Sequence, residues 1–307
     1  MSLRRYVPTG RGGPFSFTAV LGVALAGGVV VGALEGAIDK WFSLFLVFPA
    51  LIGLAAGGGA AWMIGRQRLR APLLAMLLGA AGGTAGYLAV HAVDYVRFRA
   101  DVGEMIRGES PGAADSEVAD AVDALLVQET GEAGVRGFLE IAARRGVSLK
   151  HAGASDKGLA FTGIGAWLLW LCELLVSAGI AGALARGRAK APFCESCDTW
   201  YGPEQQLAAG GAGAAGMQRA MLSALEAGDL DGAAGVLAPP PSAKASFVLT
   251  ASTCPGCGVD AHCTLKRVVY KKKGPQVSTV ESWLLTRDEA ARLGAAVTQA
   301  RARPGAA

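Results

Sequence analysis

The sequence predicts an all-α transmembrane bundle of four helices joined to a small cytoplasmic α+β domain that is held together by a metal ion. Three observations predict this fold class. The 307 residues are 52% hydrophobic and only 18% charged, with a mean hydropathy of +0.37, a composition that soluble domains rarely have. Four apolar stretches reach the roughly 20 residues that a helix needs to cross a bilayer. Two CxxC pairs follow the last of these stretches.

The four apolar stretches cover residues 15–38, 41–65, 72–93 and 159–185. The basic residues before the first stretch are also typical of a cleaved signal peptide. The apolar run continues to about residue 38, however, and the second stretch begins after only Asp39 and Lys40. A signal peptide has a shorter apolar region, so we expect the first stretch to remain as a membrane span.

Basic residues predict the orientation of the spans, because cytoplasmic loops carry an excess of Lys and Arg. Three clusters fall on one side of a four-span chain. We therefore expect residues 1–14 and 186–307 to be cytoplasmic, with the protein in the inner membrane and the loop 94–158 outside it. The clusters precede the first stretch, join the second to the third and follow the fourth: Arg4, Arg5, Arg11; Arg66, Arg68, Arg70; Arg186, Arg188, Lys190.

Glycines recur at helical spacing inside two of the predicted spans. Small residues on one helix face allow two backbones to approach closely, and this close packing stabilises helix pairs in lipid. We expect these stripes to pack the bundle itself, with homo-oligomerisation as the alternative. The first stretch contributes Gly28, Gly32 and Gly36, and the third contributes Gly79, Gly82, Gly83 and Gly86.

The outer loop predicts two short amphipathic helices, within residues 115–131 and 132–146. Asp115 or Ser116 is a suitable N-cap for the first helix, and apolar residues recur with a period near 3.6. The loop contains no cluster of His, Asp and Glu that would indicate a ligand site.

The cytoplasmic segment 186–307 is predicted to contain a helical insertion at about 203–243 and then a small antiparallel sheet. The insertion begins with a glycine- and alanine-rich linker at 205–216 and continues as a helical pair interrupted at Gly228. Strand-like runs cover 246–253, 262–270 and 277–285, and residues 271–275 form the turn between the last two. A final helix begins at Thr286, which forms a capping box with Glu289, and runs toward Arg301.

The chemistry of the cytoplasmic domain is predicted to lie in Cys194, Cys197, Cys254 and Cys257. Two thiolates three residues apart on a tight turn can bind one ion, and the glycine after Cys257 allows the backbone to turn so that amides reach the sulfurs. The cytoplasm keeps thiols reduced, which favours a metal over disulfides. Four sulfur ligands suit Zn²⁺, with iron as the alternative.

The motifs "CESC" and "CPGCG" resemble the knuckles of a zinc ribbon, in which two hairpin turns bind one structural zinc beside a small sheet. By this resemblance the same four cysteines are the ligands. The chain departs from a compact ribbon because 56 residues separate the knuckles. Rubredoxins use similar knuckles for iron, but they are short and have aromatic cores. The layout is also similar to that of uncharacterised bacterial membrane proteins with a cytoplasmic zinc ribbon, a similarity that implies no activity.

Two further cysteines and a histidine lie outside this set of four ligands. His262 and Cys263 follow the second knuckle and either could replace a ligand, although Cys263 alternates with Leu265 as expected for a strand core. Cys172 lies inside the fourth apolar stretch, where it is interpreted as an apolar filler. A site with four sulfur ligands has no open position for catalysis, so its role is structural. A domain with three short strands has little core of its own, so we expect the ion to supply much of the folding free energy.

Glu173 lies near the middle of the fourth apolar stretch, where an ionised carboxylate costs roughly 2.5–3.5 kcal/mol on insertion scales. Together with Glu35 and His91, it is a candidate proton or ion path. The alternative is that a neutral Glu173 forms a hydrogen bond between helices and fixes their register.

The functional hypothesis from these residues is a non-enzymatic, membrane-anchored scaffold whose zinc-stabilised domain binds a cytoplasmic protein. The alternative is a small transporter or channel component that uses Glu173. Nucleic-acid binding is not expected, because the positive residues form short clusters beside apolar runs. The turn with Lys271, Lys272 and Lys273 is either a solvated hairpin tip or a contact with anionic lipid.

Overall fold

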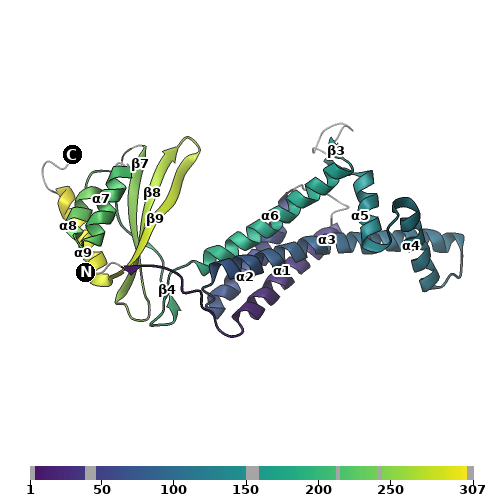
Figure 1. Ribbon diagram of the computed structural model, residues 1–307, viewed down its shortest axis with the longest axis horizontal. Coiled ribbons are helices and arrows are strands. Elements are labelled where there is room, and N and C mark those ends of the chain that lie inside the picture. The colour runs from purple at the N-terminus through teal and green to yellow at the C-terminus, as the bar shows by residue number, and fades with distance from the viewer. Residues whose placement is uncertain are drawn as a thin grey trace. The chain divides into compact units, whose positions relative to one another are not determined.

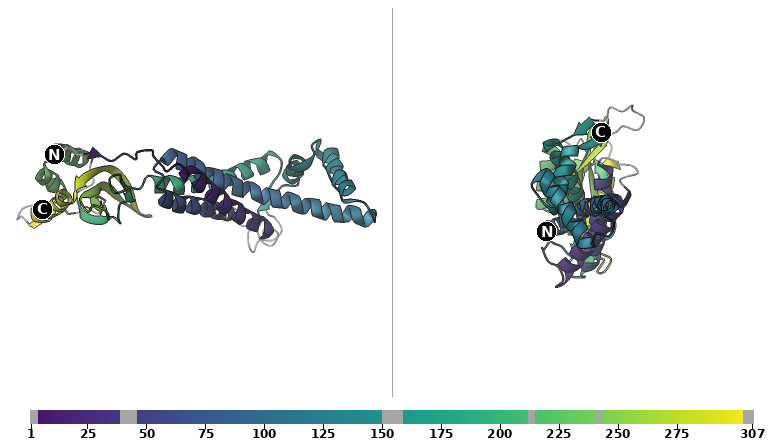
Figure 2. Two further views of the ribbon diagram at one scale, coloured as in Figure 1. Left: turned by 90° about the horizontal axis from the view of Figure 1, so that it is seen from below. Right: turned by 90° about the vertical axis from the view of Figure 1, so that its right-hand side faces the viewer.

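The computed structural model describes residues 4–38, 46–149, 159–211, 215–240, 242 and 244–302. The chain divides into two compact units (Figures 1 and 2). One is Thr9–Lys190, and the other combines Met1–Pro8 with Ala191–Ala307. The predicted start of the second apolar stretch, and the residues between it and the first stretch, lie outside the described part of the chain.

Four long helices form the first unit: α1 (Ser16–Ile38), α2 (Val47–Gln67), α3 (Pro72–Glu109) and α6 (Ile164–Ala189). All four are long and apolar enough to cross a membrane, as the sequence predicted. Where the predicted bounds fall on described residues, the largest differences from them are at the end of α3 and at the start of α6. The α3 helix does not end at residue 93 but continues to Glu109. Its 38 residues are about 57 Å long at 1.5 Å per residue, which exceeds a hydrocarbon core of about 30 Å.

The part of α3 beyond residue 93 has a small core of its own. Helices α4 (Asp115–Thr130) and α5 (Gly134–Arg145) pack against it around Val102, Val122 and Leu126. The α3 helix therefore continues beyond its apolar part, because the apolar side chains of the amphipathic continuation are buried against α4 and α5. Asp115 is the first helical residue of α4 rather than its cap, and it pairs with Arg107 at 2.8 Å.

A short hairpin precedes α6, where the sequence predicted continuous helix from residue 159. Strand β2 (Val147–Leu149) pairs with β3 (Leu159–Phe161), and α6 begins only at Ile164. Gly163 has a φ of 55°, a left-handed conformation that glycine adopts without strain and that separates the strand from the helix.

Glycine contacts make α3 the centre of the bundle. A Cβ built on Gly28 would overlap the carbonyl of Gly82, and one built on Gly86 would lie 2.5 Å from the carbonyl oxygen of Gly28. On another side of α3, Gly83 would meet the carbonyl of Ser177 at 2.7 Å, and the Ser177 hydroxyl donates to the Gly83 carbonyl at 2.9 Å. The predicted glycine stripes are therefore occupied by contacts within the chain.

The basic clusters of this unit lie at one end of the bundle. The Arg70 amide donates to the Arg11 carbonyl at 2.7 Å, and the Ser16 hydroxyl donates to the Gln67 carbonyl at 3.0 Å. The start of α1 therefore lies beside the α2–α3 connection. A Cβ on Gly65 would lie 3.2 Å from the guanidinium of Arg188, which brings the end of α6 to the same place.

The second unit contains a five-stranded antiparallel sheet in the order β1-β9-β8-β7-β6, with β1 (Arg4–Arg5) and β6 (Gln205–Gly210) at its edges. Strands β7 (Ala245–Thr253), β8 (Asp260–Lys271) and β9 (Gly274–Thr286) lie at the three predicted segments. Helices α7 (Ala215–Glu226), α8 (Leu230–Leu237) and α9 (Arg287–Ala302) cover one face of the sheet (Figure 1). The α9 capping box forms as predicted, with reciprocal hydrogen bonds between Thr286 and Glu289.

The core between this sheet and its helices is larger than three short strands would provide. It includes Phe247, Leu249, Leu265, Met221 and Leu293, all at most 1% exposed. The premise that this domain has little core of its own is therefore wrong, because the sheet and its helices bury an apolar core. How much folding free energy the metal adds stays a prediction.

Two segments join the sheet that the sequence did not predict as strands. The linker predicted from residue 205 instead begins with β6 (Gln205–Gly210), which pairs with β7. The N-terminal segment, predicted as a tail, forms β1 (Arg4–Arg5) and pairs with β9. Alanine, glycine and arginine have little strand preference of their own, so only pairing with a neighbour places them in a sheet.

Candidate metal centre

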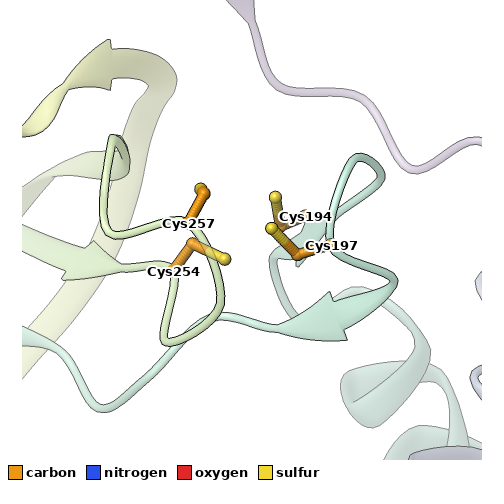
Figure 3. Close-up of side chains that lie close together, drawn as sticks. All are labelled: Cys194, Cys197, Cys254 and Cys257. Carbon is orange, nitrogen blue, oxygen red and sulfur yellow. The ribbon is translucent and has the colours of Figure 1, made fainter.

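Four cysteine side chains converge from two facing turns of the second unit (Figure 3). The Sγ atoms of Cys194, Cys197, Cys254 and Cys257 all lie within 4.8 Å of one another. A tetrahedral ion with metal–sulfur bonds of about 2.3 Å would hold its sulfurs about 3.8 Å apart, so small inward movements suffice to close the site. The structure thus brings together the four residues that the sequence singled out.

The first turn connects β4 (Phe193–Cys194) with β5 (Thr199–Trp200), which pair as a two-stranded ribbon. Asp198, directly after Cys197, has a left-handed φ of 49°. Aspartate is among the residues that tolerate this conformation best, so the turn forms here without glycine. The ring of Phe193 is 2% exposed and packs edge-to-face on Trp200 with centroids 5.0 Å apart, which anchors the turn.

The second turn connects β7 with β8 and is closed by its own backbone. The Cys254 amide donates to the Asp260 carbonyl at 3.1 Å, and the Gly258 amide donates to the Cys254 carbonyl at 3.0 Å. Gly258 has a φ of 65°, as expected for the glycine after the second cysteine. The Gly256 amide donates to the Cys254 sulfur at 3.4 Å, which is the amide–sulfur contact predicted from the motif.

Gly256, in the second turn, lies against Cys197 of the first turn. A Cβ at this position would lie 2.8 Å from the Cys197 Cβ and 3.0 Å from the Cys197 Sγ. A larger residue would therefore push the first turn away from the second. The sequence places a glycine here, but only the structure shows that its missing side chain leaves room for a ligand from the other turn.

The sheet explains how turns separated by 56 residues meet. After β5, the Gly202 amide donates to the Thr253 carbonyl at 3.0 Å, so the strand that leaves the first turn is tied to the residue before Cys254. Strand β6 then pairs with β7, and the helices α7 and α8 lie between these two strands in the chain. The insertion therefore begins and ends at neighbouring strands of the sheet, and the chain comes back beside the first turn before it forms the second.

The thiols differ in acidity without a bound ion. Hydrogen bonds from the backbone amides of Asp260 and Val259 lower the pKa of Cys257 to about 7. A hydrogen bond with Cys257 raises the pKa of Cys197 to about 12, and burial raises the pKa of Cys194. Metal binding requires thiolates, so binding releases protons and strengthens as the pH rises.

His262 and Cys263, considered above as substitute ligands, do not join the four-cysteine group. Cys263 is fully buried in the core under the helices. The ring of His262 packs edge-to-face on Tyr6, with centroids 5.0 Å apart, and lies 6.0 Å from the ring of Tyr201. Burial lowers the pKa of His262 to about 4, so the ring is neutral at physiological pH.

Tyr6 supports the metal centre and Tyr201 lies near it, and sequence reasoning missed both. The Tyr6 hydroxyl donates to the Ala191 carbonyl at 3.3 Å and accepts from the Phe193 amide at 3.1 Å, directly before Cys194. Burial, together with the nearby Cys194, raises the pKa of Tyr201. No local signal reveals Tyr6, because it is 185 residues distant in sequence from its acceptor.

The predicted intramembrane residues are brought together only in part. The Tyr87 hydroxyl donates to Glu173 Oε2 at 3.0 Å, and the His91 ring packs edge-to-face on Tyr87 at 4.9 Å and on Trp170 at 5.3 Å. Glu35 directly precedes Gly36 on α1. A Cβ built on Gly36 would lie 3.2 Å from the carbonyl oxygen of Val90, the residue before His91. Glu35 therefore lies at the level of His91. Tyr87 links two of the predicted residues, Glu173 and His91, and no feature of the sequence pointed to its hydroxyl.

Comparisons of the chain with known protein families, with curated proteins and with solved structures give no match. The functional conclusion therefore rests on the geometry itself. The described part of the chain has four helices apolar enough to cross a membrane, which indicates an integral membrane protein, and a four-cysteine group close enough together to hold one metal ion.

Proposed function

We propose that this protein is a membrane-anchored scaffold whose cytoplasmic domain contains a zinc ribbon with one structural Zn²⁺ and binds a protein partner. The observation that carries the proposal is the convergence of four thiols from two turns. Four sulfur ligands suit zinc and complete its tetrahedron, which leaves no position for water or substrate. A saturated site of this kind holds structure and does not catalyse.

The position of the N-terminal strand supports a topology with both termini on one side. Strand β1 pairs with β9, so the N-terminus and the C-terminal sheet lie on the same side of any membrane that the four helices cross. The basic clusters gather at the end of the bundle where α1 begins and α6 ends. By the positive-inside rule we infer that this side is the cytoplasm. The proposed location, the inner membrane of a bacterial cell, rests on the similarity in layout to bacterial membrane proteins.

The β8–β9 hairpin is the surface that we assign to the partner. Lys271, Lys272 and Lys273 lie at its tip, and two apolar side chains lie beside them. These are Tyr270, which is 48% exposed, and Val277, which is 60% exposed. An exposed aromatic residue next to cations is typical of protein-binding hot spots, so the expected partner has an apolar patch with an acidic rim.

Combined substitution of the hairpin tip, Tyr270→Ala with Lys272→Glu and Lys273→Glu, is expected to abolish partner capture from native membranes. The tip is exposed, so zinc content and thermal stability should remain those of the wild type. Capture is measured by affinity purification with quantitative mass spectrometry. The control Arg292→Glu reverses an exposed charge on α9 and should retain the partner. Retained capture by the hairpin variant would contradict the assignment.

A second candidate function, proton or ion transport, is favoured by the Tyr87–Glu173 hydrogen bond beside His91. If Glu173 carries protons, Glu173→Gln should reduce proton flux into liposomes at least tenfold while expression is unchanged, because the amide does not titrate. Flux is followed with a pH-sensitive dye, and Glu140→Gln, on α5, is the control. Equal flux in wild type and Glu173→Gln would leave Glu173 with a structural role.

A further inference from the structure

A groove opens on the surface of the helical bundle between α3 and α6, at the basic end. Its volume is about 510 Å³. Its walls are apolar along most of their length and include Met76, Ala80 and Leu175, whereas Arg186 and Lys190 lie at one end. The metal centre and the Tyr87–Glu173 contact contribute no residue to it.

Two glycines of this groove differ from the glycines that pack the bundle. A Cβ built on Gly179 or Gly187 would have nothing within 4 Å, whereas one on Gly182 would meet the Met76 carbonyl at 3.0 Å. Packing within the chain therefore does not require glycine at 179 or 187. The missing side chains leave the groove open toward the surroundings of the bundle, where a ligand with an apolar chain can enter.

The charge at the end of the groove is positive and available. Arg186 and Lys190 are both exposed, and neither forms an ion pair with another described residue. No Asp or Glu occurs among the described residues that line the groove. The two cations also offset the negative end of the α6 dipole, and α3 begins nearby with the positive end of its own dipole.

The length of the groove matches one leaflet of a bilayer. From Leu175 to Arg186 the α6 helix rises about 16 Å at 1.5 Å per residue. Half of a hydrocarbon core of about 30 Å is about 15 Å. An acyl chain laid along the apolar walls would therefore place its headgroup at the level of Arg186 and Lys190.

We propose that this groove is a binding site for an anionic phospholipid, with one acyl chain against α3 and α6 and the phosphate between Arg186 and Lys190. Basic pockets between membrane helices bind anionic headgroups through charge and bind the chain through apolar contact. The apolar walls suit any lipid, but the paired cations select a net negative headgroup. The inference takes the bundle to be inserted in a membrane and is independent of the scaffold partner.

The test titrates the purified full-length protein in neutral detergent with phosphatidylglycerol and with phosphatidylcholine of the same acyl chains, and counts bound lipid by native mass spectrometry. Phosphatidylglycerol should bind at least tenfold more tightly. Because a basic residue near a charged lipid contributes about fivefold, the double variant Arg186→Gln, Lys190→Gln should lose on the order of thirtyfold in affinity. Gly179→Leu should also displace the lipid, without any change in charge.

Matched controls exist for both variants. Arg11→Gln with Arg66→Gln removes the same charge at the same end of the bundle but outside the groove, and should leave lipid binding unchanged. Gly22→Leu changes a glycine that also has open space around it but lies on α1, outside the groove, and should leave binding and the melting temperature unchanged.

Four outcomes would overturn the proposal. One is equal affinity for the two lipids, and another is unchanged binding in both groove variants. The third is a shift from dimer to monomer in Gly179→Leu without loss of lipid, which would assign the groove to a second copy of the chain. Glycerol 3-phosphate carries the negative charge without an acyl chain. If it competed for the groove as strongly as phosphatidylglycerol, that result would also refute an acyl-chain site.

Discussion

If the four cysteines hold one zinc ion, as proposed, replacing Cys254 with serine is expected to lower the zinc content of the purified protein from one ion per chain to none. Even changes in the residues that support metal ligands cost about 10–100-fold in affinity, so the loss of one of four ligands should cost more than a hundredfold. The two turns should then open, because they depend on the ion to hold them together. Metal is measured by mass spectrometry of the digested protein, and the absence of visible absorbance distinguishes zinc from iron.

The extent of unfolding in Cys254→Ser tests how far the metal centre supports the domain. The sheet has its own core under α7, α8 and α9, so we expect hydrogen exchange to rise in residues 194–204 and 254–259 while β7 and β8 stay protected. The control Cys172→Ser changes an exposed cysteine of α6 and should retain one zinc. Full zinc occupancy in Cys254→Ser would refute the four-cysteine site.

Gly256→Ala provides a milder disruption of the same site. All four ligands remain, but the new methyl group would lie 2.8 Å from the Cys197 Cβ and force the turns apart. We expect zinc affinity to fall by about 10–100-fold, the range typical of changes next to metal ligands. A competition titration with a zinc chelator measures this affinity, and an unchanged value would show that the turns adjust without cost.

Substituting Gly86 with valine is expected to destabilise the helical bundle by about 3 kcal/mol. A Cβ at this position would lie 2.5 Å both from the Gly28 carbonyl oxygen and from the Ile52 Cγ2, so α1 and α2 must both move away from α3. Because backbone contact replaces the hydrophobic effect in lipid, little other packing can compensate. Denaturation in mixed detergent micelles, followed by circular dichroism, gives the change.

The matched control for this substitution is Gly22→Val. Gly22 also lies on an apolar helix, but a Cβ there has nothing within 4 Å. Valine has a higher helix propensity than glycine, so this variant should be neutral or slightly more stable. Equal destabilisation in both variants would indicate an effect on helix propensity or insertion and would contradict the role of the α1–α3 contact.

The sequence by itself determined the elements whose cause is local or compositional. Apolar stretches long enough to span a bilayer predicted the four long helices, because hydropathy and length suffice to identify them. The CxxC spacing singled out the four cysteines, since two thiols on a tight turn already favour one ion. Thr286 and Glu289 predicted the start of α9 because a capping box lies within four residues.

Only the tertiary structure decided the features that depend on partners far along the chain. Strands β1 and β6 have no strand-like sequence and form because β9 and β7 offer them hydrogen bonds. The extension of α3 past residue 93 persists because α4 and α5 cover it. Tyr6 supports the residue next to Cys194, and Gly256 leaves room for Cys197, through contacts across at least 59 residues. Local pattern encodes secondary structure and ligand chemistry, whereas close approach between distant backbones appears only once the chain is folded.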